Sequence, residues 1–429
     1  MHIPPYPLPR GATARLAWAL LAATLIAAPA LAQPTIPPGP RPWKPIPPPA
    51  GAIDIRAHGA ACDGIKDDAP AITAALKAAA GKPGATVLFP PSAKPCLLKT
   101  ALSLPEGVTL LAEPGTVTLK AAPGNAARPV LLSLASHSKL IGLSFDGGGA
   151  DNANTNPVII GYHATDITLD HIALRHTRGI GLLFSSSIAR VAVHDSTFED
   201  LGNHWKQTHL AKDRIQGVVF CCGAGNTDNS AEHNHFADIG LDALQFSNQT
   251  GAIARFNRFT LENGERAAVP APDYPAAMYL VLDTRLTIAD NRVEGAQGNC
   301  IDAPGIADAE ILRNTVTGCG QAGIGLFDSP ADGHPRVSSH NVLIEGNEIT
   351  NNVHWAASVF KGGISLSGAA SNVRLKANRI TDTQARKTQQ FAVFGRPGNA
   401  VSALAVEPSN KLDGNAAGVY SGLPAPKPN

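Results

Sequence analysis

Asparagine recurs through the middle of this chain in one local setting. Each copy follows a short strand-like run and precedes a small group of turn residues, as in IADNRV and ILRNTV. The six positions are Asn234, Asn257, Asn291, Asn314, Asn347 and Asn378. Successive copies are 23, 34, 23, 33 and 31 residues apart, so a unit of about 23 residues carries insertions of about ten. This period predicts a solenoid, and the alternating texture predicts strands rather than helices.

The repeated asparagine has a physical role in such a stack. Equivalent residues of successive coils lie about 4.8 Å apart, so one side-chain amide can donate to the next and form a ladder. Asparagine also tolerates left-handed backbone geometry, and the alternative is that it serves only as a turn residue. Two earlier units fit the pattern with His171 and Ser196 at the asparagine position.

The N-terminal residues are typical of an exported protein. In residues 1–32, Arg10 and Arg15 precede an apolar stretch, and Ala-Leu-Ala ends the segment like a signal-peptide cleavage site. The stretch is short for a bilayer span, so we expect a secreted or periplasmic protein without membrane contact after cleavage. Residues 33–50 contain nine prolines, which predicts an extended linker.

Charge argues against a nucleic-acid partner. Cleavage after residue 32 removes two of the 35 basic residues and none of the 34 acidic ones, which leaves 33 against 34 and a formal charge of −1. The oligomeric state stays open. The predicted organisation is a signal peptide (1–32), a Pro-rich linker (33–50), an N-terminal cap with the first coils (51–136), β-helix repeats (137–384), and a C-terminal coil remnant with a Pro-rich tail (385–429).

The segment before the repeats predicts a helix among short strands. Asp68 is a suitable N-cap for a helix over residues 69–80, with Pro70 in the first turn. One face of this helix is apolar, so it can cover the open end of a β-solenoid. Cys62 and Cys96 flank the helix and can form a disulfide in an exported protein.

Several motifs of this segment recur in a known family. They are a Gly-Ala then Asp-Gly loop, the pair Asp67-Asp68 that opens a helix, a Phe-Pro-Pro turn and a Leu-Pro-x-Gly-Val strand, all within residues 51–120. The segment thereby resembles the pectate-lyase superfamily, with its rhamnogalacturonase-like and epimerase-like proteins. The resemblance implies an all-β solenoid, a single-stranded right-handed parallel β-helix with an N-terminal capping helix. It also implies a polysaccharide or oligosaccharide substrate, although tailspikes and adhesins share the fold.

The other four cysteines carry weaker signals. Cys221 and Cys222 are adjacent, and because a bridge between neighbours is strained, we interpret them as structural or incidental. Cys300 and Cys319 lie nine and five residues after their asparagines, and this mismatch predicts that they do not pair. No cysteine has a zinc-ligand spacing.

Three aspartates close strand-like segments in consecutive predicted coils. They are Asp283 in AMYLVLDT, Asp302 in GNCIDAPG and Asp328 in GIGLFDSP. If the strand registers agree, the carboxylates form one outward column over about 10 Å. Like charges at this spacing keep one carboxyl protonated as a general acid, while another acts as base or nucleophile. The trio predicts the catalytic residues of a glycoside hydrolase; the alternatives are a calcium site and plain turn residues.

The chain departs from the galacturonase branch of the family. It lacks Asn-Thr-Asp, Gly-His-Gly and Arg-x-Lys at the corresponding coils. A polygalacturonase is therefore not expected, and no residue role is transferred from that branch. Asp242 is a further acid, but its phase with Leu244 and Phe246 directs it inward.

Aromatic and basic residues around the predicted column can bind sugar. Aromatic faces stack on sugar rings, and Arg or Lys bind carboxylates. The predicted substrate-binding residues are Trp205, Lys212, Arg266, Tyr274 and Lys361. No metal or cofactor is predicted, with Ca²⁺ as an option only for a lyase.

Three functions compete at this stage. The first is a glycoside hydrolase with paired aspartates. The second is a polysaccharide lyase or uronate epimerase, in which Lys361, Lys212 or Arg266 acts as the base. The third is a non-catalytic carbohydrate-binding or surface protein. New reducing ends indicate the hydrolase, an ultraviolet-absorbing double bond indicates the lyase, and binding without product indicates the third.

Overall fold

The computed structural model describes residues 37–423, with the exception of residues 83, 124–130, 153–155, 209, 211–212, 262–274 and 330–335. The predicted signal peptide lies outside the described residues. The compact unit begins at Pro37. Among the described helices, none has the length and apolar character needed to cross a membrane.

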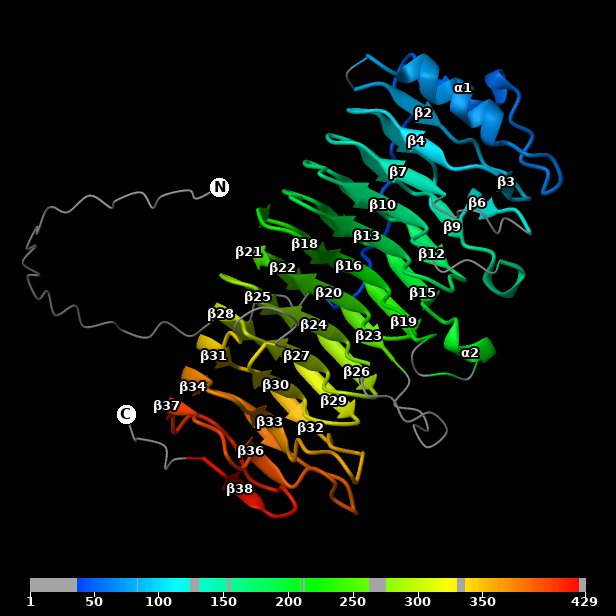
Figure 1. The fold of residues 1–429 in the computed structure, drawn as a ribbon. Helices are drawn as coiled ribbons and strands as arrows, with labels where there is room; N and C mark the ends of the chain where they lie inside the picture. Colours follow the sequence, from blue (N-terminus) through cyan, green and yellow to red (C-terminus); the bar gives the residue numbers. More distant parts are fainter. Residues whose placement is uncertain are drawn as a thin grey trace, which may run out of the picture. The chain divides into compact units, whose positions relative to one another are not determined.

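Short parallel strands stack into three long sheets that surround one core (Figure 1). Sheet A contains β1 (Ile53–Asp54), β2 (Thr86–Leu88), β5 (Thr109–Leu111), β8 (Lys139–Ile141), β11 (Thr168–Asp170), β14 (Ala192–His194), β18 (Ser230–Glu232), β22 (Ile253–Arg255), β25 (Thr287–Ala289), β28 (Ala307–Leu312), β31 (His340–Glu345), β34 (Ser371–Lys376) and β37 (Ser402–Val406).

Sheet B follows sheet A in each coil. It contains β3 (Cys96–Leu98), β6 (Thr118–Ala121), β9 (Ser144–Asp146), β12 (Ala173–Arg175), β15 (Thr197–Leu201), β19 (His235–Ile239), β23 (Arg258–Thr260), β26 (Arg292–Ala296), β29 (Thr315–Cys319), β32 (Glu348–Thr350) and β35 (Arg379–Thr381).

Sheet C completes each coil and faces the viewer in Figure 1. It contains β4 (Leu102–Leu104), β7 (Leu132–Leu134), β10 (Ile159–Tyr162), β13 (Leu182–Ser185), β16 (Val218–Cys221), β20 (Leu244–Ser247), β24 (Met278–Val281), β27 (Ile301–Pro304), β30 (Ile324–Phe327), β33 (Gly362–Leu366), β36 (Phe391–Gly395) and β38 (Gly418–Ser421). A small pair, β17 (Asn226–Thr227) and β21 (Gln249–Thr250), lies at the turn from sheet C to sheet A.

The parallel strand register aligns the inward side chains of successive coils and so forms the core. Inward residues of one coil stack on the same residue type in the next, as in Phe198, Phe236 and Phe259, whose ring centroids are 5.2 and 4.7 Å apart. All three are fully buried. Because each coil buries its apolar residues against its neighbours, the array needs no separate domains.

The asparagine ladder is confirmed at the turn from sheet A to sheet B. Asn291 Oδ1 accepts the backbone N–H and the Nδ2–H of Asn257 at 2.9 and 3.0 Å, and the same pair of bonds links Asn291 to Asn314. The ladder continues to Asn410, beyond the six predicted copies. The left-handed residue of these turns precedes the asparagine, as at Asp290 with φ 56°, so the asparagine serves the ladder rather than the left-handed conformation.

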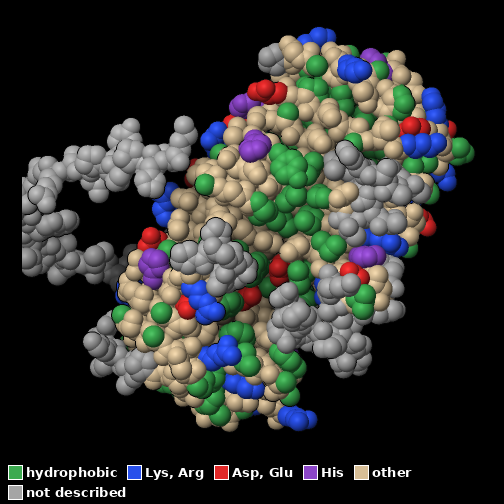
Figure 2. Space-filling view, in the orientation of Figure 1, with side chains coloured by type: hydrophobic (Ala, Val, Ile, Leu, Met, Phe, Trp, Pro, Cys, Tyr) green, Lys and Arg blue, Asp and Glu red, His purple; other side chains and the backbone are tan. Residues whose placement is uncertain are grey.

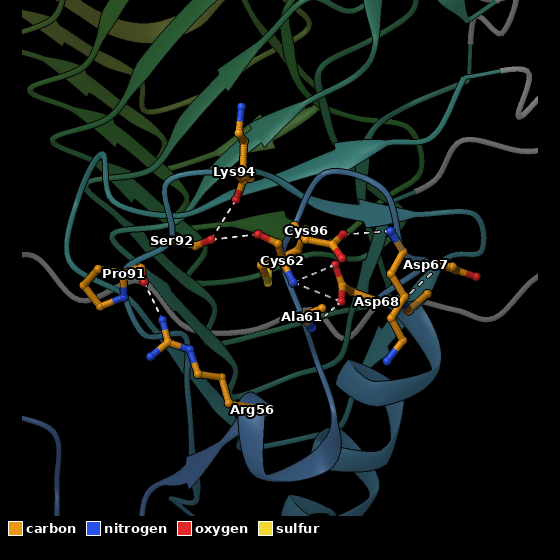
Figure 3. The surroundings of a disulfide bond; sticks show 12 residues. Arg56, Ala61, Cys62, Asp67, Asp68, Pro91, Ser92, Lys94 and Cys96 are labelled. Atoms are coloured by element: carbon orange, nitrogen blue, oxygen red, sulfur yellow. Dashed lines mark hydrogen bonds between the residues drawn. A yellow bond between two sulfur atoms is a disulfide. The ribbon is translucent and has the colours of Figure 1, made fainter.

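The N-terminal region contains the expected helix, α1 (Ala69–Ala79), at the end of the stack (Figure 1). Asp68 occupies the N-cap position but does not bond the helix. Its carboxylate instead accepts the backbone N–H groups of Ala61 and Cys62, at 2.7 and 3.2 Å, beside the Cys62–Cys96 disulfide (Figure 3). The predicted pairing of these two cysteines is thus present. The remaining short helices are η1 (Ile55–His58), η2 (Gly149–Asp151) and α2 (Trp205–Thr208).

Two expectations about the rest of the chain are corrected. Residues 385–423 are not a remnant, because β36, β37 and β38 continue the sheets. Cys300 and Cys319 are bonded, with Cα atoms 5.6 Å apart. Their different offsets do not matter. Cys319 ends β29 of sheet B in register with Ala296, the last residue of β26, and Cys300 immediately precedes β27, the sheet C strand that follows β26. Both cysteines therefore lie at the same corner between these two sheets. Cys221 and Cys222 form a vicinal disulfide.

The proline-rich segment after residue 36 is extended but also packed against the β-helix. Arg41 donates from Nε to Asp195 Oδ1 at 2.8 Å and also pairs with Asp195 Oδ2. The Arg41 carbonyl lies 3.0 Å from His171 Nε2, and Trp43 packs edge-on against the His171 ring. Residues 37–48 therefore form a strap over the turn from sheet A to sheet B rather than a free linker.

Candidate functional site

The outer face of sheet C carries two columns of side chains. Strand alternation directs every second residue outward, and the parallel registers align these residues across coils. The first column contains Ser103, Ser133, Ile160, Leu183, Val219, Gln245, Tyr279, Asp302, Gly325, Ser365 and Phe394. The second contains Tyr162 paired with Ser185, Ser247 paired with Val281, and Pro304 paired with Phe327. The face is mainly apolar and hydroxyl-bearing, and Figure 2 shows hydrophobic side chains gathered along its middle.

Asp302 is the only ionisable carboxylate among these described positions. It lies on β27, is partly exposed, and its Oδ1 accepts Asn299 Nδ2–H at 2.7 Å. Burial raises the pKa of Asp302 to about 7, and the bond from Asn299 opposes this shift. The carboxyl therefore exchanges its proton near neutral pH, as a general acid or base requires.

Two neighbours shape the position of Asp302. Asn299 is buried, and its Oδ1 accepts the Ala322 N–H at 2.9 Å, so the next coil fixes the amide that holds Asp302. Gly325 lies opposite Asp302 in the following coil, where an added Cβ would come within 2.8 Å of Asn299 Nδ2. A glycine at this position leaves room for the Asn299–Asp302 pair.

The predicted single column of three aspartates is wrong. In strand register, Asp302 pairs with Tyr279 and Gly325. Asp283 therefore lies four residues after Tyr279, the residue that pairs with Asp302, and Asp328 lies three residues after Gly325, the residue that pairs with Asp302 in the next coil. With 3.3 Å per residue and 4.8 Å per coil, these offsets correspond to about 14 and 11 Å. The insertions between the strands do not bring the three residues to equivalent positions, because Asp283 and Asp328 follow their strands whereas Asp302 lies within one.

Asp283 is an interior turn residue. Its side chain is fully buried, and Oδ1 accepts the backbone N–H of Gln249 at 2.7 Å. Burial raises the pKa of Asp283 well above its ordinary value. Asp328 is partly exposed after β30, and its Oδ1 accepts the Ala369 N–H at 3.0 Å. These contacts fit the alternative interpretation of both residues as turn-forming groups. Asp242 is buried as expected and accepts the Ala276 N–H.

The predicted substrate-binding residues are dispersed. The Trp205 ring is covered by the Arg214 guanidinium at 3.9 Å, and its Nε1 donates to Asn203 Oδ1, so its ring already has a partner. Lys361 precedes β33 and its Nζ donates to the Ala356 carbonyl at 3.1 Å. Lys212, Arg266 and Tyr274 lie outside the described residues.

A separate polar cavity lies at the turn from sheet B to sheet C. Its volume is about 600 Å³, and its lining includes Asp146, His176, Lys206 and Asp238. Lys206 Nζ lies 2.5 Å from Asp238 Oδ2, and His176 Nδ1 lies 3.0 Å from Asp146 Oδ2. The side chains of this cavity thus contact one another in pairs, whereas Asp302 lies on the outer face of sheet C.

Sequence reasoning missed the partners of Asp302. Asn299 lies three residues before it in the same segment, GNCIDAPG, and that short spacing is the only local signal. Gly325 and Tyr279 become relevant only through the registers that pair them with Asp302, which no local pattern encodes.

Comparison with known proteins supports the fold independently. A family model described as "Right handed beta helix region" matches residues 135–385 and 276–421. No curated protein sequence matches the chain. The A-module of mannuronan C-5 epimerase AlgE6 from Azotobacter vinelandii is a similar structure, with TM-score 0.57 and 18% identity over 86% of this chain and all of that one.

Two further structures share the fold at low identity. The catalytic domain of a GH87 alpha-1,3-glucanase in complex with nigerose has TM-score 0.54 and 14% identity, over 89% of this chain and 68% of that one. A tailspike protein of E. coli bacteriophage HK620, in complex with a pentasaccharide, has TM-score 0.58 and 11% identity, over 85% and 67%. The predicted right-handed parallel β-helix is confirmed.

Proposed function

Since the chain belongs to the right-handed β-helix family, we propose that it is a polysaccharide-active enzyme exported from the cell, and specifically a glycoside hydrolase. The outer face of sheet C is the substrate-binding surface in this proposal. The structural neighbours named above include proteins that act on or bind saccharides, which supports the substrate class. The observation that carries the proposal is Asp302, a partly exposed carboxyl on that face whose pKa is raised to about 7.

The geometry at Asp302 suits a general acid. Oδ1 accepts the Asn299 N–H, which leaves Oδ2 to carry the proton. In the proposed step, Oδ2–H protonates the glycosidic oxygen while the bond from the anomeric carbon to that oxygen breaks. A water molecule adds its hydroxide to the anomeric carbon and returns a proton to Asp302. The products are two shorter sugars, one with a new reducing end.

This proposal replaces the paired-aspartate mechanism with one acid. Asp283 is enclosed in the core, and Asp328 is about 11 Å away in strand register. Lys361, considered as a lyase base, donates to its own loop and is about 16 Å from Asp302 by the same register.

The test is a screen of purified protein against neutral and acidic polysaccharides. Reducing ends and ultraviolet-absorbing double bonds are measured together. We expect reducing ends alone, and we expect Asp302→Asn to lower turnover by about 10²-fold or more because asparagine has no transferable proton.

Asp283→Asn is the matched control. It makes the same chemical change at a buried position, where the amide oxygen can still accept the Gln249 N–H, so turnover should be unchanged. Full activity of Asp302→Asn would refute the proposed acid. Double-bond products would indicate a lyase, and binding without any product would indicate the non-catalytic alternative.

A further inference from the structure

We propose that the sugar unit bound at Asp302 is uncharged, so that the substrate is a neutral polysaccharide rather than a polyuronate. This inference rests on the proposed function and narrows its substrate. Its basis is the set of side chains that the outer face of sheet C presents around Asp302.

The two outward columns contain no Lys or Arg at any described position. The first column runs from Ser103 to Phe394 and has Asp302 as its one charged member. A uronate bound beside Asp302 would place two carboxylates together without a neutralising cation, and like charges repel strongly at a partly buried site.

Two basic residues adjoin strands of sheet C further along the stack. Arg396 follows β36, three coils beyond Asp302, and Lys361 precedes β33, two coils beyond. Strand and coil spacings put each about 16 Å from Asp302. In addition, Lys361 Nζ is engaged by the Ala356 carbonyl. Neither residue can neutralise a carboxylate on the sugar that reacts at Asp302.

The same observation bears on the reaction type. Removal of a proton next to a uronate carboxylate, as elimination or epimerisation requires, needs a positive group on that carboxylate in the transition state. The described positions of the two outward columns supply none, whereas protonation of a glycosidic oxygen requires only the acid itself. The side chains around Asp302 therefore fit the hydrolysis of a neutral glycan better than the elimination or epimerisation of a uronate.

The remaining surface suits an uncharged sugar chain. Ile160, Leu183 and Val219 follow one another in the first column, and Tyr279 lies next to Asp302 in register. Figure 2 shows hydrophobic side chains gathered along the middle of this face. Apolar and aromatic side chains bind the C–H faces of sugar rings, and that contact gains free energy by removing apolar surface from water.

The experiment uses three matched pairs of polymers: polymannuronate, polygalacturonate and polyglucuronate, each compared with its carboxyl-reduced form. Reduction converts every uronate into a neutral hexose and keeps the linkage. We expect the full-length protein to bind at least one reduced polymer tenfold or more tightly than its parent at pH 8, where Asp302 is ionised. Binding of the neutral form should be insensitive to salt.

A pair of variants locates the binding surface. Leu183→Glu places a charge in the apolar band and should weaken binding of the neutral polymer at least tenfold. Ala192 lies on β14, the sheet A strand that follows β13 in the sequence. Ala192→Glu should leave the binding of the neutral polymer unchanged. Equal effects of the two changes would show that the band does not bind the glycan.

The outcomes separate this inference from the proposed function. Tighter binding of a parent polyuronate, with cleavage that yields a double bond, overturns the neutral substrate and leaves polysaccharide activity standing. Binding of neither member in any pair overturns both proposals.

Discussion

Replacement of Asn291 by alanine should destabilise the fold more than any exposed substitution. Asn291 is 1% exposed, and its Oδ1 accepts two bonds from Asn257 at 2.9 and 3.0 Å. Its Nδ2 donates to the Ala254 carbonyl and to Asn314 Oδ1, both at 2.9 Å. Alanine removes all four bonds and leaves the buried Asn257 N–H without its acceptor.

The magnitude follows from this unpaired donor and the other lost bonds. The unpaired donor costs about 1–3 kcal/mol, and because three further bonds are lost we expect a decrease of about 3 kcal/mol in the free energy of unfolding. The assay is urea unfolding followed by circular dichroism, read as a shift in midpoint at constant slope. Asn291→Ser should cost less, because Ser196 already occupies a ladder position and its Oγ accepts the Ile172 N–H at 3.1 Å.

Asn372→Gly provides the control. Asn372 is exposed and has a left-handed φ of 50°, which glycine adopts without strain, so the change should stay within about 0.5 kcal/mol. If Asn291→Ala loses no more stability than this control, the ladder contributes nothing and the reasoning fails.

Three further predictions concern Asp302, its neighbour and the strap. Because the folded state raises the pKa of Asp302 from 3.8 to about 7, it binds this proton more tightly than the unfolded state. The free energy of unfolding should therefore decrease as the pH rises from about 4 to 7, and Asp302→Asn should remove this decrease in urea titrations. Activity should fall as the pH rises through about 7. Asn299→Ala removes the bond that lowers the Asp302 pKa, so the pH–rate inflection should move upward; an unmoved inflection would contradict its positioning role. Arg41→Ala leaves Asp195, whose side chain is 1% exposed, without its bidentate partner. The free energy of unfolding should therefore decrease by about 1–3 kcal/mol, and protease cleavage near residue 45 should accelerate. The control Lys44→Ala should change neither quantity.

The sequence was sufficient to predict the fold because its signals repeat locally. The coils from Asn234 to Asn378 each place an asparagine after a strand of sheet A, so spacing alone revealed the stack and the ladder. The left-handed turn residue was misassigned to the asparagine itself, because Asp290 and its equivalents differ in type from coil to coil. Cys300 and Cys319 were misjudged for a related reason, since offsets measured along strands do not describe the corner between two sheets.

The candidate site was predictable only in part. Asp302 was identified because it closes a strand-like segment, but the same criterion selected Asp283, which the chain turns into the core. Whether an aspartate falls on the outward or inward side depends on where each insertion ends, and one residue of difference reverses the face. The strap contact between Arg41 and Asp195 joins residues 154 positions apart, and no local pattern can reveal such a pair.

The source of the oxygen at the cleaved bond tests the central claim most directly. The reaction would be run in ¹⁸O-labelled water with the polysaccharide that the screen identifies, and the products analysed by mass spectrometry. Hydrolysis with Asp302 as the acid predicts one ¹⁸O atom at each new reducing end, with at least about 10²-fold less labelled product from Asp302→Asn than from Asp283→Asn. Unlabelled products that carry a double bond, or equal labelling by the two variants, would contradict the account.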